Sequence, residues 1–458
     1  MPGLLSKLKN KHFLSLSGNV IMSGVGMLTF AILYHQLSPS EMGTWVFFQA
    51  MLIIVDTFRS GFLNTAFIKF YAGSEKPRAD AILGSTWYIA MAITGFFVLL
   101  NIAAFFLLPY IADPGLLLFI KWFSITFVCM LPAYIASCVV QAEQRFDRLL
   151  FIRFVTQFIF IAWIIVLIFM HKLNLQNVVY ANLGANLITS LITIFNGFSR
   201  IKAVALRTKA TTLEIFNFGK FSVGTSLSAN LFSRSDIIII NFMFGPVNGP
   251  ATVAIYSLGQ KFMELVEIPL RSFAATAMPS LSSAYNRKNK EEVIYILKKY
   301  AGVLTVLLVP CCIISVLLAD FVIGLVGGGK YAGTAIGTQA ANVYRLFMTF
   351  SLLYPADRFL AITLDAIHKP RINFYKVLIM LAANIIGDFA GILILGNVYG
   401  VAITTFIPIL IGALIGYYYL RKYQPFAFFD IYRLGYTEVK MAVRPYWQKL
   451  RGKETPIP

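Results

Sequence analysis

The stretch SPSEMGTWVFFQ, at residues 38–49, has a counterpart, GPATVAIYSLGQ, at residues 249–260 of the same chain. Each stretch opens a long apolar segment. At one constant offset the two regions share four pairs of matched residues, namely Pro39 and Pro250, Trp45 and Tyr256, Gln49 and Gln260, and Asp56 and Glu267. At the same offset, Arg59 and Arg271 fall within one position of each other. We interpret this match as an internal repeat that divides the chain into two halves.

The composition places most of this chain in a membrane. Of its 458 residues, 58% are hydrophobic and only 13% are charged, whereas soluble proteins carry about 25% charged residues. A spanning helix needs about 20 mostly apolar residues, so about a dozen spans would use more than half of the chain. The sequence therefore predicts an all-α polytopic membrane protein without a sizeable soluble domain.

Breaks between the apolar segments predict about 12 transmembrane helices. We expect them at residues 12–37, 42–68, 80–110, 114–140, 149–171, 175–199, 215–244, 251–284, 293–326, 335–367, 372–396 and 398–420. The segments 251–284 and 335–367 are long enough to include additional turns. The expected parts of the chain are an N-terminal six-helix bundle at 1–199, a basic cytoplasmic linker at 200–214, a C-terminal six-helix bundle at 215–420 and a basic cytoplasmic tail at 421–458. An even number of spans in each half makes the two bundles a parallel repeat.

The net charge of +19 is explained better by membrane topology than by nucleic-acid binding. Most Lys and Arg residues lie in short stretches between apolar segments, as cytoplasmic loops require, and no basic patch has the aromatic spacing of a nucleic-acid module. With the N-terminus in the cytoplasm, the outer side receives only Lys121, Lys172 and Lys330, and the cytoplasmic loops receive most of the others, Lys376 among them. This partition predicts that both termini are cytoplasmic. The four cysteines lack CxxC or Cys/His spacing, so no metal site is expected.

Ionisable residues remain inside the predicted spans, where each charge costs roughly 2.5–3.5 kcal/mol at the bilayer centre. They must therefore face one another or water. Because a guanidinium binds phosphate through two parallel hydrogen bonds, the candidates for binding a phosphate-bearing substrate are Arg59, Arg234, Arg271, Arg345 and Arg358. The candidates for ion coupling or charge pairing are Asp56, Lys261, Glu264, Glu267, Asp357 and Asp388.

The spacing of these residues supports a shared face. Lys261, Glu264, Glu267 and Arg271 recur every three or four residues, which places them on one side of a helix. Asp56 and Arg59 have the same relation in the matching span. Two interpretations remain open, because these charges could line a hydrated cavity between the halves or form structural ion pairs that hold helices together.

Prolines interrupt the apolar pattern of several predicted spans, among them Pro132, Pro269, Pro279 and Pro355. Each removes a backbone hydrogen bond, so we expect them to interrupt or kink their helices, either for movement or only for packing. The stretch 436–453 predicts either an amphipathic helix at the membrane surface or a disordered cytoplasmic end.

Three stretches carry a family resemblance: LSPSEMGTWVFFQAMLIIVDTFRSGF (37–62), MFGPVNGPATVAIYSLGQKFMELVEIPLRSFAATAMPSLS (243–282) and LVGGGKYAGTA (325–335). With these stretches and its predicted layout of six plus six spans, the chain resembles the multidrug/oligosaccharidyl-lipid/polysaccharide (MOP) exporter superfamily. Within that superfamily it most resembles the polysaccharide biosynthesis branch of Wzx-type flippases.

The resemblance implies a transporter of two six-helix bundles in the bacterial inner membrane. It would move an undecaprenyl-diphosphate-linked oligosaccharide to the periplasmic leaflet by alternating access, for O-antigen, capsule or exopolysaccharide synthesis. Cavity arginines would bind the diphosphate, and Arg59 and Arg271 match the expected second-span and eighth-span positions. The implied partners are the lipid-linked oligosaccharide, membrane lipids and other membrane proteins of polysaccharide assembly, with the chain acting as a monomer. A proton or a sodium ion is the expected coupling ion, and no other cofactor is expected.

Two other functions compete with this one. An ion-coupled antiporter of drugs or organic cations in the same superfamily would favour an acidic cavity, whereas arginines are at least as prominent here. A membrane-integral polysaccharide polymerase or ligase would need a sizeable external loop with catalytic residues. The longest predicted outer loop, near 326–335, is short, rich in glycine and lacks both acid and histidine, so we do not expect an enzyme.

Overall fold

The motif that opens the first repeat is the start of a helix. The Ser38 hydroxyl accepts a hydrogen bond from the Glu41 backbone N–H (3.2 Å), and the Glu41 carboxylate accepts one from the Ser38 backbone N–H (2.9 Å). This reciprocal capping satisfies two N–H groups that have no partner within the helix. Pro39 adds a preset backbone angle in the first turn. The sequence S-P-S-E therefore fixes where helix α3 (Pro39–Tyr71) begins.

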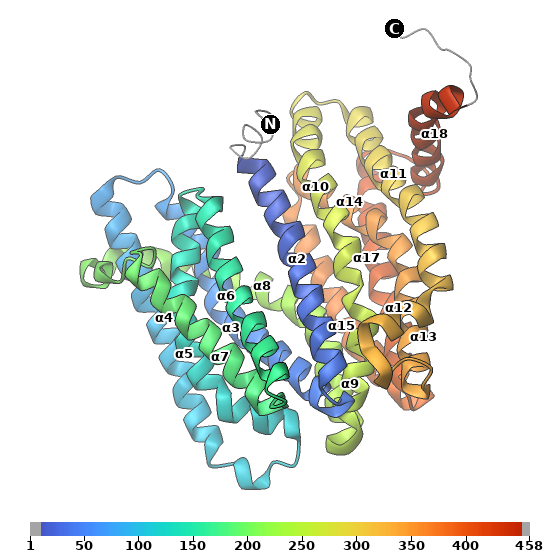
Figure 1. Cartoon of the computed structure of the whole chain (residues 1–458). Coiled ribbons are helices and arrows are strands. Elements are labelled where there is room, and N and C mark those ends of the chain that lie inside the picture. The colour runs from blue at the N-terminus through green and yellow to red at the C-terminus, as the bar shows by residue number, and fades with distance from the viewer. Residues whose placement is uncertain (1–10, 451–458) are drawn as a thin grey trace. The chain divides into compact units, whose positions relative to one another are not determined.

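The computed structural model describes residues 11–450, and all regular structure in that range is helical (Figure 1). The earlier helices are α2 (Lys11–Gln36), α3, α4 (Lys76–Phe105), η1 (Leu108–Tyr110), α5 (Pro114–Ala142), α6 (Phe146–Phe169), α7 (Leu175–Phe195), η2 (Ile201–Leu206), α8 (Lys209–Met243) and α9 (Gly245–Lys261). The later helices are α10 (Met263–Asn286), α11 (Lys290–Leu317), α12 (Ala319–Gly327), η3 (Gly328–Lys330), α13 (Ala335–Phe350), η4 (Ser351–Leu353), α14 (Tyr354–Ala366), α15 (Pro370–Leu395), α16 (Val398–Thr404), α17 (Phe406–Tyr423) and α18 (Asp430–Leu450). The predicted all-α class is confirmed.

Within the described residues, eight helical segments are long and apolar enough to cross a membrane. They are α3, α4, α5, α6, α7, α11, α15 and the segment Val398–Tyr423. The chain is therefore a multi-pass membrane protein. The other predicted spans coincide with α2, α8, α9 with α10, and α13 with α14. The total of about 12 spans, the parallel repeat and the orientation of the termini stay predictions.

Contacts between residues group the chain into two units. Unit 1 comprises the described residues up to Ser257 together with Val326–Lys330, and unit 2 comprises Leu258–Leu325 together with the described residues from Tyr331 onward. The border falls near the end of α9, beyond the predicted linker at 200–214, which forms η2 and the start of α8. The division into repeat-based bundles at 1–199 and 215–420 stays a prediction.

The two long predicted spans contain the additional turns that their length suggested. The segment 251–284 is divided at Phe262 into α9 and α10, and the segment 335–367 is divided by η4. Pro355 explains the second division, because it has no N–H for the Ser351 carbonyl one turn earlier. Pro132, Pro269 and Pro279 instead lie inside continuous helices, so these three prolines do not end their helices, and the expected kinks stay a prediction.

In unit 1 the start of α3 lies directly against α9. A Cβ atom added to Gly43 would lie 1.6 Å from the backbone carbonyl oxygen of Pro250, so only glycine fits there. Close by, the Tyr34 hydroxyl of α2 donates a hydrogen bond to the Ala254 carbonyl of α9 (2.8 Å). The opening motif of the first repeat therefore packs against the opening motif of the second.

In unit 2 the C-terminal helix α18 packs against α11. A Cβ atom on Gly302 would lie 2.0 Å from the Ile431 carbonyl oxygen, so the two backbones approach each other closely. Glu438 forms an ion pair with Lys299 (2.9 Å) and accepts a hydrogen bond from the Tyr295 hydroxyl (2.7 Å). These contacts hold the pKa of the Glu438 carboxyl below its usual value, with the Lys299 contact as the largest cause. Residues 430–450 are thus a packed helix and not a disordered end.

The Glu438 contacts predict a pH-dependent attachment of α18. A depressed carboxyl pKa stabilises the packed state above the usual pKa of glutamate, and this contribution is lost as the pH falls below that value. We expect the amides of α18 to keep their protection from neutral pH down to the usual pKa of glutamate, about 4.3, and to lose it progressively between there and about pH 3. Hydrogen–deuterium exchange, corrected for the pH dependence of intrinsic exchange, measures this change. Glu438→Gln should lower protection already at neutral pH; equal protection of the native helix at neutral pH and at about pH 3 would contradict the prediction.

Candidate functional site

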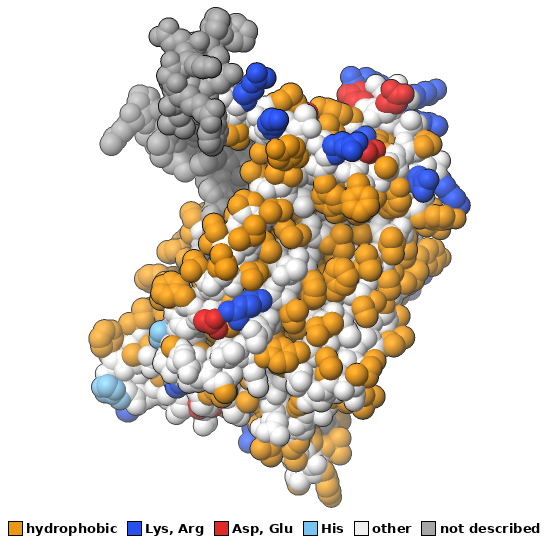
Figure 2. Space-filling model, turned by 90° about the vertical axis from the view of Figure 1, so that its right-hand side faces the viewer, with side chains coloured by type: hydrophobic (Ala, Val, Ile, Leu, Met, Phe, Trp, Pro, Cys, Tyr) orange, Lys and Arg blue, Asp and Glu red, His pale blue; other side chains and the backbone are white. Residues whose placement is uncertain are grey.

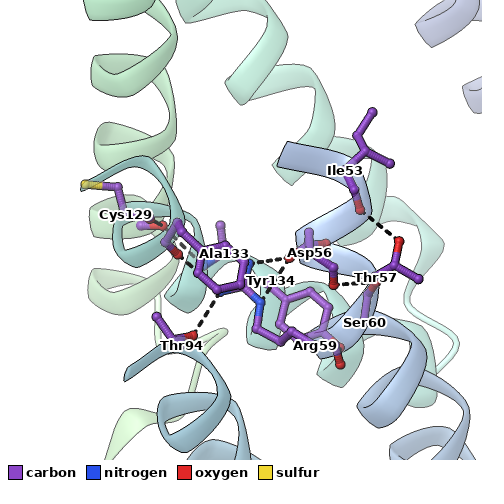
Figure 3. A network of polar contacts seen from close by, with 11 residues as sticks. Ile53, Asp56, Thr57, Arg59, Ser60, Thr94, Cys129, Ala133 and Tyr134 are labelled. Atoms are coloured by element: carbon purple, nitrogen blue, oxygen red, sulfur yellow. Dashed lines mark hydrogen bonds and ion pairs between the residues drawn. The ribbon is translucent and has the colours of Figure 1, made fainter. Parts of the chain in front are cut away.

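Arg59 of α3 is fully buried in unit 1, with 0% of its side chain exposed. Its Nε and Nη2 atoms donate to the same Asp56 oxygen (3.0 and 2.5 Å), one turn away on α3. Its Nη1 atom donates to the Thr94 hydroxyl of α4 (3.4 Å) and to the Phe127 carbonyl of α5 (3.1 Å). The guanidinium thus joins three helices (Figure 3).

Aromatic rings complete the surroundings of this cation. The guanidinium carbon lies 4.1 Å from the centre of the Phe127 ring and 5.0 Å from that of Tyr134, both on α5. Rings at this distance attract a cation, and more strongly away from water. In this conformation Arg59 is therefore enclosed by protein groups, which is the arrangement of a structural ion pair. The predicted contact between Arg59 and a diphosphate would need a different conformation of unit 1.

Beside this network, a side chain from α7 bridges two backbone groups of α5. Pro132 removes one N–H from α5. The Ser190 hydroxyl of α7 donates to the Cys129 carbonyl (2.5 Å) and accepts a hydrogen bond from the Ala133 N–H (3.2 Å). Those two backbone groups would bond directly in a regular helix. A hydroxyl inserted into the hydrogen-bond ladder is a recognised cause of helix bending, so Ser190 acts together with Pro132.

In unit 2 the predicted charges of the segment 251–284 form pairs. Lys261, the last residue of α9, lies 2.7 Å from Glu264 of α10, and Arg271 forms an ion pair with Glu267 within α10. The exposed fraction of the side chain is 72% for Arg271 and 44% for Glu267. Charges that face lipid cost roughly 2.5–3.5 kcal/mol each. Pairing lowers this cost, and contact of the exposed pair with water or a polar ligand would lower it further.

The two arginines matched by the repeat therefore lie in opposite environments. Arg59 is buried and lies on the long continuous helix α3. Arg271 is exposed and lies on α10, which is separated from α9 by a helix break at Phe262. The sequence match alone gave no means of separating them, because burial depends on which helices pack against each face.

The remaining candidate arginines differ in accessibility. Arg358 is exposed on α14, which packs beside α10, and Arg234 is half-buried on α8. Arg345 of α13 pairs with Asp320 of α12 (2.5 Å) and donates to the Asn342 side chain (2.7 Å) and the Val316 carbonyl (3.2 Å). Asp320 was missed among the charges of the predicted span 293–326, the end of which forms the separate short helix α12.

Asp357 of α14 pairs with a lysine that the sequence placed elsewhere. Its carboxylate lies 2.7 Å from the ammonium of Lys376, and only 3% of the Lys376 side chain is exposed. Lys376 therefore lies inside α15 and not in a loop, while its assignment to the cytoplasmic side stays a prediction. In the sequence, Lys376 follows the basic residues Lys369 and Arg371, so it was grouped with them.

Asp388 of α15 is fully buried. It accepts hydrogen bonds from the Asn384 side chain (3.1 Å), one turn earlier on the same helix, and from the Thr404 hydroxyl of α16 (3.4 Å). Asn384 was missed, although its spacing of four residues from Asp388 indicates a shared helix face. A buried carboxylate within a span, held by an amide N–H and a hydroxyl donor, can take up a proton or bind a small cation through its own oxygens.

The contrast between Arg59 and Arg271 predicts different effects on stability. Asp56→Ala leaves the Arg59 cation buried without its carboxylate, so we expect the free energy of unfolding to fall by about 3–5 kcal/mol. Arg271→Ala removes one partner of an exposed pair and should cost less than about 1 kcal/mol. Thermal unfolding of the purified variants in one detergent compares the two. Similar losses in both would contradict the structural role of the Arg59 network.

Comparisons with known proteins agree with this architecture. A flippase of Haloferax volcanii, named as the probable low-salt glycan biosynthesis flippase Agl15, is 19% identical over 413 residues, covering 90% of this chain and 83% of that protein. The fold is similar to the inward closed conformation of the lipid II flippase MurJ (TM-score 0.73, 15% identity, 97% and 94% of the two chains). It is also similar to an inward-facing MATE multidrug transporter of the MOP superfamily (TM-score 0.72, 14% identity, 90% and 98%).

A profile of one family covers about two thirds of the chain. Residues 32–336 match the family described as polysaccharide biosynthesis protein, and this range includes both repeat motifs and the stretch at 325–335. The resemblance inferred from those stretches is thereby confirmed. The chain belongs to the family described as polysaccharide biosynthesis protein.

Proposed function

We propose that this protein is a flippase that moves a lipid-linked oligosaccharide, carried on undecaprenyl diphosphate, from the cytoplasmic to the periplasmic leaflet of a bacterial inner membrane. The product would serve the synthesis of a surface polysaccharide such as O-antigen, capsule or exopolysaccharide. Within the family, the observation that carries this proposal is the exposed Glu267–Arg271 pair on α10. The glycan flippase among the relatives supports the substrate class.

The Glu267–Arg271 pair suits reversible binding of a diphosphate. Without substrate, Glu267 neutralises Arg271 and limits the cost of an exposed charge within a span. A diphosphate presents several oxygens to the planar guanidinium and can form two parallel hydrogen bonds with it. It would therefore replace the single carboxylate, and Glu267 would recover Arg271 after release. Arg358, exposed on the neighbouring helix α14, is a second candidate contact.

The energy for transport comes from outside the binding site. An anion that moves outward across an inside-negative membrane gains about 2.3 kcal/mol per charge for each 100 mV. We assign ion coupling to Asp388, because it is fully buried and lies against the side chains of Asn384 and Thr404. The coupling ion would be a proton or a sodium ion. No chemical step is proposed for the chain, which would act as a monomer with other membrane proteins of polysaccharide assembly.

Replacing Arg271 tests the binding proposal. In vesicles with the purified protein and a fluorescent undecaprenyl-diphosphate oligosaccharide, we expect Arg271→Ala to reduce flipping about tenfold or more, because a charge-assisted contact is lost. Quenching of the label from outside measures the flipped fraction. Arg287→Ala is a matched control, since Arg287 is 61% exposed and pairs with Glu292 just beyond the end of the same helix.

The outcomes separate the binding proposal from its alternatives. Unchanged flipping by Arg271→Ala would remove this arginine from the substrate site. No flipping by the native protein, together with efflux of organic cations from the same vesicles, would favour a drug antiporter and overturn the proposed cargo.

Replacing Asp388 tests the coupling proposal. Asp388→Asn keeps the shape of the side chain but removes its charge, so we expect flipping to lose its dependence on an imposed proton or sodium gradient. Glu264→Gln, on the exposed end of α10, should retain that dependence. A gradient response in Asp388→Asn equal to that of the native protein would show that coupling lies elsewhere.

A further inference from the structure

A pocket of about 550 Å³ lies in unit 2, where α13, the end of α15 and α16 meet. This volume is typical of sites for small molecules and lipid headgroups. Its apolar walls come from Leu346, Leu395 and Ile403. Its polar side chains are Asn342, Arg345, Thr349, Asn397 and Tyr399.

The polar groups of this pocket hold one another in place. Asn342 accepts a hydrogen bond from Arg345 (2.7 Å) through its oxygen and donates one to the Tyr399 hydroxyl (3.2 Å) through its nitrogen. The Asn397 side chain caps α16 by accepting from the Tyr399 backbone N–H (3.0 Å). A ligand would therefore meet an ordered set of groups and would not have to order them itself.

Two opposite charges lie close together here: Arg345 lines the pocket, and Asp320 lies beside it. Arg345, which is 29% exposed, lies 2.5 Å from the carboxylate of Asp320, which is 63% exposed. A phosphate that binds Arg345 alone leaves the Asp320 carboxylate without its cation. A ligand with a phosphate and an ammonium group a short distance apart satisfies both side chains at once.

The surface around the pocket is strongly apolar. Leu317 and Phe321 are exposed beside Asp320, and Leu393 and Ile394 are exposed beside the pocket wall on α15. The side of the molecule that carries α12 and α13 is mostly hydrophobic, with an acidic and a basic side chain next to each other on it (Figure 2).

The position of the pocket along the helices also suits a lipid. It lies where α11 and α15 end and α12 and α16 begin. Ends of spanning helices lie near the level of lipid headgroups. Charges at that level and apolar side chains beside them match the two parts of a phospholipid.

We propose that this pocket binds a zwitterionic phospholipid, of the phosphatidylethanolamine class. Its phosphate binds Arg345, its ammonium binds Asp320, and its acyl chains lie along the exposed apolar residues of α12 and α15. The site is separate from the charged face of α10, and it does not depend on the identity of the transported molecule.

Native mass spectrometry of the purified full chain tests this site. We expect phosphatidylethanolamine to be retained about tenfold more tightly than phosphatidylglycerol, and Asp320→Asn or Arg345→Gln to abolish the difference. Asp320→Asn is the more conservative variant, because it keeps the shape of an exposed side chain. The matched controls Arg287→Gln and Glu292→Gln remove another exposed pair and should leave the preference intact.

Three results would overturn the proposal. One is equal retention of the two lipids by the native protein, which would leave Asp320 without a role. Another is displacement of phosphatidylethanolamine by inorganic phosphate, which would identify a simple anion site. The third is an unchanged preference in both Asp320→Asn and Arg345→Gln, which would place the lipid elsewhere.

Discussion

A guanidinium enclosed in an apolar helix bundle must find acceptors within the protein, and Arg59 meets this requirement by joining α3, α4 and α5. Each acceptor comes from a different kind of group: a carboxylate, a hydroxyl and a backbone carbonyl. Because all of them must be in place together, the network fixes how the three helices pack. The same requirement explains the ion pair on α10 and the one between α14 and α15. These pairs differ from the Arg59 network in how exposed their side chains are.

The two halves solve this requirement differently. In unit 1, α3 continues without a break past its charged pair. In unit 2, the matching segment is divided before its charged pair, and the predicted tenth span is divided at η4. Accessible arginines lie on the divided segments and the enclosed arginine on the continuous one. The repeat motif thus marks equivalent positions along the chain, while the surrounding packing gives them different roles.

The sequence was most informative where one helix contains the whole signal. Its composition predicted the helical membrane class, the repeat motif included a capping box that starts α3, and the spacing of the charges at 261–271 placed them close enough to pair, which was one of the two interpretations. Contacts between helices were beyond its reach. The burial of Arg59, the partnership of Lys376 with Asp357 and that of Asp320 with Arg345 each depend on which segments pack together. The local sequence around each residue does not indicate which helices pack against it.

The close backbone contact between Gly302 of α11 and Ile431 of α18 has a consequence for biogenesis. During synthesis, α11 enters the membrane long before α18 is made, because α12 to α17 lie between them in the chain. The surface of α11 around Gly302, which α18 covers in the folded chain, therefore stays exposed while α12 to α17 are made. Packing of α18 then covers this surface and joins the last helix of the described residues to one of the first helices of unit 2. A nascent chain that stops before α18 would leave the surface accessible to chaperones and proteases.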